Sequence, residues 1–83
     1  MATSPTPTFI VSPARLGELV RNARQAFGWT QEAAARRAGV GARFLGELEN
    51  GKATVRLDKV LRVLKAVSLS FAVLPTGPRP PAR

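Results

Sequence analysis

Apolar residues recur at helical spacing over four stretches of the chain, and capping residues bound most of these stretches. The first stretch predicts a helix from Pro13 to about Phe27, with Ser12 as its N-cap and Gly28 as the left-handed residue that ends it. Val11, directly before the cap, is expected to pack on Leu16 as a hydrophobic staple. The residues expected to face the core are Leu16, Leu19, Val20, Ala23 and Phe27.

Two short helices around a glycine-containing turn are predicted in the middle of the chain. The first runs from Gln31 to Ala38 behind the N-cap Thr30, and the second runs from about Ala42 to Glu49. The turn between them consists of Gly39, Val40 and Gly41. The residues expected to be buried in this pair are Ala34, Ala35, Ala38, Leu45 and Leu48. Such a pair is typical of a helix-turn-helix motif, whose second helix enters the major groove of DNA.

The last part of the chain changes from a helical period to a period of two. A fourth helix is predicted from about Leu57 to Val67, with its inward residues being Leu57, Val60, Leu61 and Leu64. After it, Leu69, Phe71 and Val73 alternate with small or polar residues, which predicts a β-strand over residues 68–74. A single strand needs a partner. The candidate partners are residues 9–11 of the same chain and the same strand of a second copy, which would form a dimer.

Composition divides the chain into one folded domain and two ends. At 83 residues the chain has room for a single domain, and the predicted elements place this all-α domain at residues 9–67. Residues 1–8 contain mainly Ser, Thr and Pro, and residues 75–83 contain mainly Pro and Arg. Segments of this kind bury too little apolar surface to fold, so both are expected to be flexible tails.

The residue types that are missing exclude most catalytic chemistry. The chain has no cysteine and no histidine. Disulfides, thiolate zinc sites and cysteine nucleophiles are therefore excluded, as are the commonest general base and the commonest transition-metal ligand. We expect no catalytic residues, no metal site and no cofactor, so an enzyme is not expected.

The charge balance points to a polyanionic partner. Thirteen Lys and Arg residues stand against five Asp and Glu residues, for a net charge of +8. The simplest partner for such a short basic chain is nucleic acid. No apolar run approaches the ~18 residues that span a bilayer, and no signal peptide is visible, so a cytoplasmic protein without a membrane partner is expected.

Two segments of the middle region resemble a known family. Residues 30–40 read T-Q-E-A-A-A-R-R-A-G-V, and residues 48–52 read L-E-N-G-K. Both are similar to the helix-turn-helix of the phage-repressor (Xre) family, and the resemblance extends over about residues 15–67. The stretch at 53–67 with a terminal strand is similar to HipB-type antitoxins, the DNA-binding partners of HipA-type kinase toxins. The resemblance implies a four-helix, lambda-repressor-like domain with a C-terminal β-strand for dimerisation.

The resemblance implies a set of DNA contacts when the family's DNA-contacting positions are matched to this sequence. Gln31 matches a glutamine that clamps a phosphate and the edge of the outer base pair. Arg43 lies at a base-reading position and can bond bidentately to guanine O6 and N7. Gly41 and Ala42 lie at such positions without hydrogen-bonding side chains, which favours close backbone approach or shape readout. The expected DNA-contacting residues are Gln31, Gly41, Ala42, Arg43, Phe44, Glu47, Asn50, Gly51 and Lys52.

Some of these positions have two interpretations. Phe44 either touches a thymine methyl group or packs against the preceding helix, and packing is preferred. Glu47 either accepts a hydrogen bond from cytosine N4 or orients Arg43 one turn earlier on the helix. Lys52 is expected to meet phosphate, against the alternative of an ordinary surface lysine. The resemblance also implies that Glu49 forms a structural ion pair with Arg24 and makes no base contact.

The function that the sequence predicts is a sequence-specific transcriptional repressor. It would bind a palindromic operator in double-stranded DNA as a homodimer, with half-sites about one helical turn apart. The HipB-like ending predicts an antitoxin that autoregulates the operon of a HipA-type kinase toxin. The alternatives are a stand-alone phage-like repressor and a protein-interaction module that does not bind DNA. The residues expected to form the dimer are Leu69, Phe71 and Val73.

Overall fold

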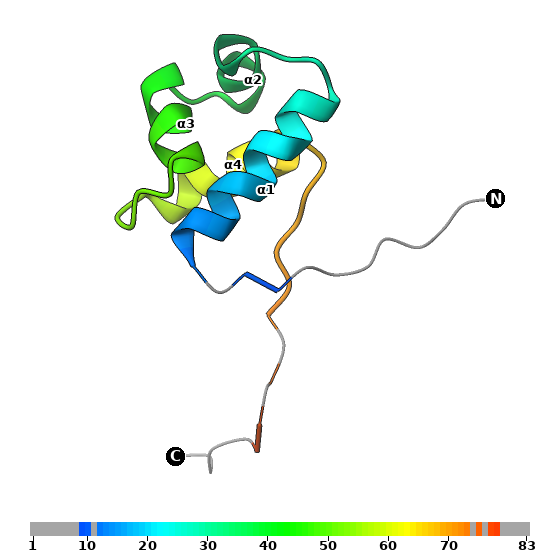
Figure 1. Ribbon diagram of the computed structural model, residues 1–83, viewed down its shortest axis with the longest axis vertical. Coiled ribbons are helices and arrows are strands. Elements are labelled where there is room, and N and C mark those ends of the chain that lie inside the picture. The colour runs from blue at the N-terminus through cyan, green and yellow to red at the C-terminus, as the bar shows by residue number, and fades with distance from the viewer. Residues whose placement is uncertain (1–8, 11, 74, 76, 79–83) are drawn as a thin grey trace, which may run out of the picture.

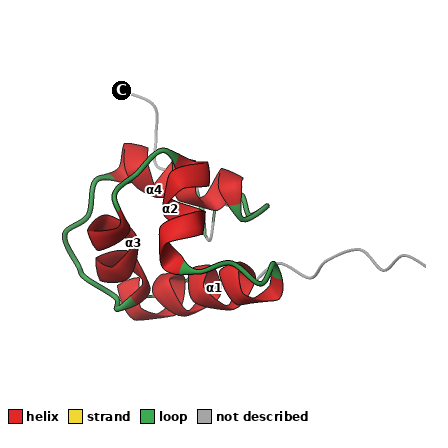
Figure 2. Ribbon diagram, turned by 90° about the horizontal axis from the view of Figure 1, so that it is seen from above, coloured by secondary structure: helices red, strands yellow, loops and turns green. Residues whose placement is uncertain are grey.

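The computed structural model describes residues 9–10, 12–73, 75 and 77–78, and within them the chain forms four helices. These are α1 (Pro13–Ala26), α2 (Gln31–Ala38), α3 (Ala42–Glu49) and α4 (Leu57–Ala66). The third helix packs against α1 and α2, and α2 also packs against α4 (Figure 1). From above, α1 lies along one side of the domain and the other three helices lie opposite (Figure 2). The predicted four-helix, all-α fold is confirmed.

Side chains and glycines terminate the helices where the sequence predicts. The hydroxyl group of Ser12 accepts a hydrogen bond from the backbone N–H of Arg15 at 3.1 Å, and Thr30 caps α2 in the same way. Gly28 and Gly39 have φ values of +73°, which other residues adopt only with strain. The staple predicted for Val11 lies outside the described residues, as do residues 1–8, 79–83, Leu74 and Thr76.

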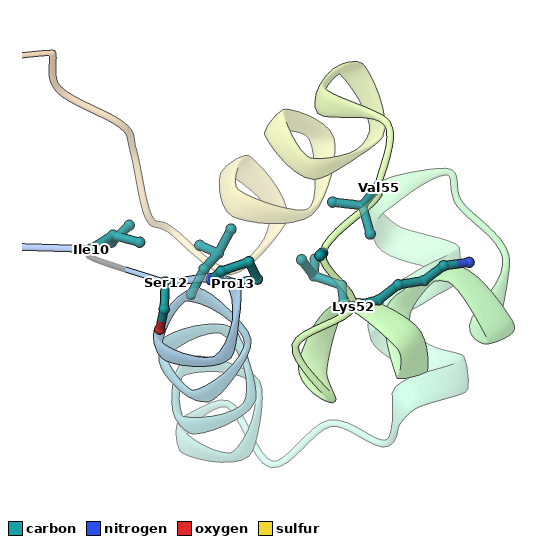
Figure 3. A pocket seen from close by; sticks show the side chains of 8 residues that line it. Ile10, Ser12, Pro13, Lys52 and Val55 are labelled. Atoms are coloured by element: carbon teal, nitrogen blue, oxygen red, sulfur yellow. The ribbon is translucent and has the colours of Figure 1, made fainter.

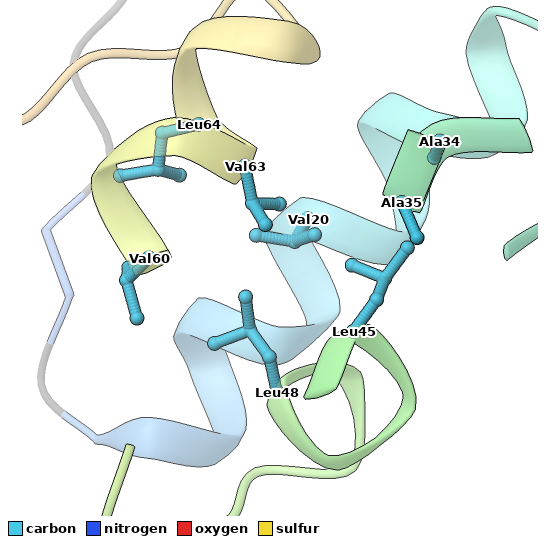
Figure 4. Packing of buried hydrophobic residues seen from close by; sticks show 8 residues of the cluster. All are labelled: Val20, Ala34, Ala35, Leu45, Leu48, Val60, Val63 and Leu64. Carbon is cyan, nitrogen blue, oxygen red and sulfur yellow. The ribbon is translucent and has the colours of Figure 1, made fainter. Parts of the chain in front are cut away.

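The core lies between the four helices and consists of aliphatic side chains (Figure 4). The alanines of α2 let this helix approach its neighbours closely, and leucines of α3 fill the space beside them. The fully buried members of the core cluster are Val20, Ala34, Ala35, Leu45, Leu48, Val60, Val63 and Leu64. Burial of these side chains provides the main favourable contribution to folding.

The inward face predicted for α4 is wrong at two positions. Leu57 is 62% exposed and Leu61 is 46% exposed, whereas Val63 and Val67 are buried. Apolar residues cover a wide arc of this helix, and only part of the arc can face a domain that lies on one side of it. The buried residues instead follow the spacing that runs through Val60, Val63 and Val67. Leu57 and Leu61 are left as an exposed apolar pair one turn apart.

The predicted C-terminal strand is also corrected, since no strand forms among the described residues. Ser68 turns the chain with a φ of +61°, and Leu69 then donates its N–H to the carbonyl of Leu64 at the end of α4. Leu69 packs on the core, but Phe71 is partly exposed and Val73 is 97% exposed. A strand requires a second backbone to form its ladder, and the described part of this chain presents none to residues 69–73.

Two helices approach each other closely where Gly17 of α1 meets the end of α3. A Cβ atom at Gly17 would lie 2.4 Å from the carbonyl oxygen of Leu48 and 2.6 Å from that of Glu49. Just beyond, Gly51 has a φ of +80°, and a Cβ there would lie 2.8 Å from Cα of Ala14. Glycine therefore sets the position of the C-terminal end of α3 on α1.

Candidate nucleic-acid interface

The N-terminal end of α3 presents one long side chain to solvent. Gly39 ends α2 in the left-handed conformation, and Gly41 is the N-cap of α3 without a side-chain hydrogen bond. Gly41 is exposed, but Ala42 packs against the core cluster. Arg43 projects outward, with its side chain 94% exposed. Of the first three positions expected to read bases, only Arg43 therefore carries hydrogen-bond donors on its side chain.

Glu47 links the two cations expected at this surface. Its Oε2 atom lies 2.6 Å from Nζ of Lys52, and its Oε1 atom lies 3.7 Å from Nε of Arg43. The hydrogen bond from Lys52 lowers the pKa of the Glu47 carboxyl, so the group is ionised at neutral pH. The arrangement agrees with the interpretation in which Glu47 orients Arg43. Its contact with Lys52 was not anticipated from the sequence.

Phe44 lies on the side of α3 that turns toward the domain. It is half-buried and packs against the core cluster, and Nζ of Lys59 on α4 lies 5.6 Å from its ring centre. This position favours the packing interpretation over a contact with a thymine methyl group. Lys59 supplies a cation–π contact to the ring.

A buried carboxylate joins three helices behind this surface. The Glu49 side chain is 0% exposed and accepts hydrogen bonds from Nε and Nη2 of Arg24 at 2.7 and 2.9 Å. The contact expected between these two residues is therefore present. Gln31 donates its side-chain N–H to Glu49 at 3.1 Å, and Nε of Arg21 lies 3.6 Å away. Arg24 in turn donates to the carbonyl of Trp29 at 2.8 Å.

These hydrogen bonds determine the ionisation of the cluster. Burial acts to raise the pKa of Glu49, but the hydrogen bonds from Arg24 and Gln31 outweigh it and lower the pKa. The hydrogen bond to Glu49 raises the pKa of Arg24. Both groups are therefore charged at neutral pH, and the carboxylate ties the start of α2 and the end of α3 to α1.

The Gln31 side chain lies between α2 and α3. Its amide lies over Gly46 of α3, where a Cβ atom would be 3.6 Å from Oε1 of Gln31. The residue is half-buried and bonded to Glu49. The predicted DNA-clamping residue is thus also a bridge between α2 and α3, which the sequence interpretation did not include.

Two further arginines have roles that the sequence interpretation missed. Arg21, assigned to an outer face, donates from Nη2 to Oδ1 of Asn50 at 3.2 Å. Its spacing of three residues from Arg24 indicates a shared helix face and was the available signal. Arg37 covers Trp29, with Cζ 4.4 Å from the ring centre, and Trp29 stacks on Phe27 at 4.4 Å.

An apolar cavity of about 210 Å³ lies beside this region, between the start of α1 and the loop after α3 (Figure 3). Ile10, Pro13 and Val55 line it, and the amine of Lys52 points away from Ile10 and Ser12.

Among the described residues, no group of three or more acidic, His or Cys side chains could hold a metal ion. No helix among the residues that the structure describes is long and apolar enough to cross a membrane.

Comparison with known proteins shows the family to which the chain belongs. A family model described as helix-turn-helix matches residues 20–74. The chain belongs to the helix-turn-helix family. An uncharacterised HTH-type transcriptional regulator, y4mF, of Sinorhizobium fredii (strain NBRC 101917 / NGR234) is 43% identical over 70 residues, which are 84% of this chain and 92% of that protein. The chain is accordingly a helix-turn-helix transcriptional regulator, and its resemblance to the Xre family is confirmed.

Solved structures of helix-turn-helix proteins share the fold. HipB in a HipA–HipB–O2–O3 complex superposes with a TM-score of 0.75 at 27% identity, covering 84% of this chain and 99% of HipB. HipB in an O4 20mer complex gives a TM-score of 0.75 at 26% identity, again covering 84% and 99%. The restriction-modification controller protein C.AhdI of Aeromonas hydrophila gives a TM-score of 0.63 at 28% identity, covering 70% and 84%. The resemblance to HipB-type proteins extends to the whole helical domain.

Proposed function

We propose that this helix-turn-helix regulator represses transcription by binding a specific site in double-stranded DNA through α3 and the loop that follows it. The observation that carries the proposal is the exposed guanidinium of Arg43 at the N-terminal end of α3, on a chain with a net charge of +8. In helix-turn-helix proteins this end of the second helix meets base edges. Lys52 and the backbone of Asn50 and Gly51 would lie against phosphate.

Binding to DNA is expected to depend strongly on salt. If a dimer neutralises about six phosphates, the slope of log affinity against log salt concentration should be about −5. The measurement is a titration of the DNA upstream of the chain's own coding sequence between low and moderate salt, after footprinting has located the site. A slope near zero contradicts DNA binding and favours the protein-interaction module.

Arg43 and Lys52 are expected to respond differently to substitution. Arg43→Ala should weaken binding to the footprinted site by about 1–3 kcal/mol and relax its sequence preference, because a bidentate contact to guanine is lost. Lys52→Ala should weaken binding to all sequences alike and reduce the salt slope by about one. Competition assays with the footprinted and random duplexes measure both effects. Equal losses on both duplexes for Arg43→Ala would assign that residue to the DNA backbone.

The regulator is proposed to act as a homodimer on a palindromic operator. Support comes from the exposed apolar pair Leu57 and Leu61 on α4 and from the exposed side chains of Phe71 and Val73. Apolar surface of this kind is costly to leave in water and is typical of interfaces. Two-fold symmetry would place both recognition helices on one side of the DNA, about one helical turn apart.

Leu61→Glu is expected to separate the dimer into monomers, because a carboxylate would be buried at the contact between two copies of α4. Sedimentation measures the association state. Arg62→Glu is the matched control, since it places the same carboxylate on the neighbouring, exposed position. A dimer of unchanged strength in Leu61→Glu would move the interface elsewhere, with Phe71 and Val73 as the next positions to substitute.

More specifically, we propose that the chain is an antitoxin that pairs with a HipA-type kinase toxin and autoregulates their operon. It is supported by the likeness of the whole helical domain to HipB in a complex with HipA. The alternative is a stand-alone phage-like repressor, and the likeness to the restriction-modification controller protein C.AhdI supports it. Footprinting of the chain's own promoter, with and without the product of the adjacent gene, distinguishes the two. A kinase-sized product that extends or strengthens the footprint supports the antitoxin.

A further inference from the structure

Glu47 is the acidic side chain at the centre of the proposed DNA surface. It is one-third exposed and contacts Lys52 through one carboxylate oxygen and Arg43 through the other. The three groups together carry one net positive charge. A phosphate that approached Lys52 would meet an ammonium group already bonded to a carboxylate 2.6 Å away. Non-specific DNA binding is carried almost entirely by such cation–phosphate contacts.

We propose that Glu47 is a specificity-determining residue that competes with DNA phosphate for Lys52 and so suppresses binding to non-cognate sequences. The inference rests on the proposed function and deepens it. On any DNA, Lys52 must exchange the Glu47 carboxylate for a phosphate, and the remaining negative charge repels the backbone.

The cognate site recovers part of this loss through Arg43. With Oε1 of Glu47 3.7 Å from Nε of Arg43, the carboxylate limits the directions in which the guanidinium can point. A guanidinium whose directions are limited by a neighbouring carboxylate loses less conformational freedom when it bonds to a base edge. Glu47 therefore weakens binding to every sequence through Lys52, and its effect on Arg43 offsets part of that loss where a guanine faces Arg43.

The test is Glu47→Gln, which keeps the size of the side chain and removes its charge. On a scrambled duplex we expect the affinity of each bound chain to rise roughly two- to fivefold at 0.1 M salt, the range that the loss of one exposed ion pair accounts for. The rise should shrink as the salt concentration increases, because salt screens exposed charges. On the footprinted duplex the gain should be smaller, because Arg43 is no longer oriented, and the ratio of the two affinities should fall.

Two controls separate the local contact from the change in net charge. Glu18→Gln makes the same charge change on α1, where Glu18 pairs with Arg15, and should leave the ratio of affinities unchanged. In a Lys52→Gln background, Glu47→Gln should have a smaller effect on the scrambled duplex, because the competition for Lys52 is already absent and only the repulsion between the carboxylate and phosphate remains. Thermal melting checks that each variant is folded.

Each outcome decides the matter. An unchanged affinity for the scrambled duplex, equal gains on both duplexes, or an undiminished effect in the Lys52→Gln background overturns the competition by Glu47. A loss confined to the footprinted duplex also overturns it and assigns Glu47 to reading a base. A wild-type chain that binds neither duplex at low salt overturns the proposed function itself, and this inference with it.

Discussion

Gly17→Ala is expected to leave the chain largely unfolded at ambient temperature. The added Cβ atom would lie 2.4 and 2.6 Å from two backbone carbonyl oxygens of α3, and backbone atoms cannot move aside as the end of a flexible side chain can. Overpacking of a well-packed site costs about 1–3 kcal/mol, and a clash with backbone lies at or above the top of this range. A domain this small has little stability in reserve.

The matched control is Gly46→Ala on α3. A Cβ there meets Oε1 of Gln31 at 3.6 Å, an ordinary contact distance, and alanine has a higher helix propensity than glycine. Gly46→Ala should therefore keep or raise the melting temperature. Circular dichroism during heating compares the two variants with the wild type. If Gly17→Ala melts at the wild-type temperature, α1 and α3 are not held in the contact described here.

Glu49→Ala is the second substitution with a large expected effect. It leaves the guanidinium of Arg24 largely buried without its carboxylate, and loss of one partner of a buried pair costs about 3–5 kcal/mol. It also removes the acceptor for Gln31 and so loosens α2 from α3. Urea denaturation at neutral pH measures the loss. Glu18→Ala, on the exposed surface of α1, should change stability little.

The same carboxylate predicts acid sensitivity. The pKa of Glu49 is lower in the folded chain than its ordinary value of 4.5, so the unfolded chain binds the proton more tightly. The stabilisation is therefore complete above pH 4.5 and is lost as the pH falls through the folded-state pKa. Glu49→Gln should be less stable than wild type at neutral pH. Its free energy of unfolding should also change less with pH below pH 4.5 than that of the wild type. If the free energy of unfolding changes with pH in the same way for the two proteins, Glu49 is not the source of the acid sensitivity.

The helices and the motif were predictable because their signals are local. Ser12 and Thr30 cap helices through bonds to residues three positions away, and Gly28 and Gly39 end helices through their own backbone conformation. The T-Q and L-E-N-G-K segments identified the family on which the position of Arg43 and the pairing of Glu49 depended. None of these predictions required knowledge of which segments meet in space.

Predictions that depended on which segments pack together were less successful. The alternation of Leu69, Phe71 and Val73 indicated a strand, but an apolar alternation cannot supply the second backbone that a ladder needs. On α4, Leu57 and Leu61 lie within the apolar arc and could not be separated from the buried residues by spacing alone. Which part of an arc is buried depends on where the other helices lie.

The sequence by itself determined four helices with their ends, a helix-turn-helix motif and a basic chain without cysteine or histidine. Only the tertiary structure decided that Gly17 is the point where α1 touches α3, and that one carboxylate, Glu47, holds both Arg43 and Lys52. The physical reason is that caps and turns are set by bonds within a few residues, whereas close packing and charge clusters depend on distances between segments. Those distances exist only once the core has brought the helices together.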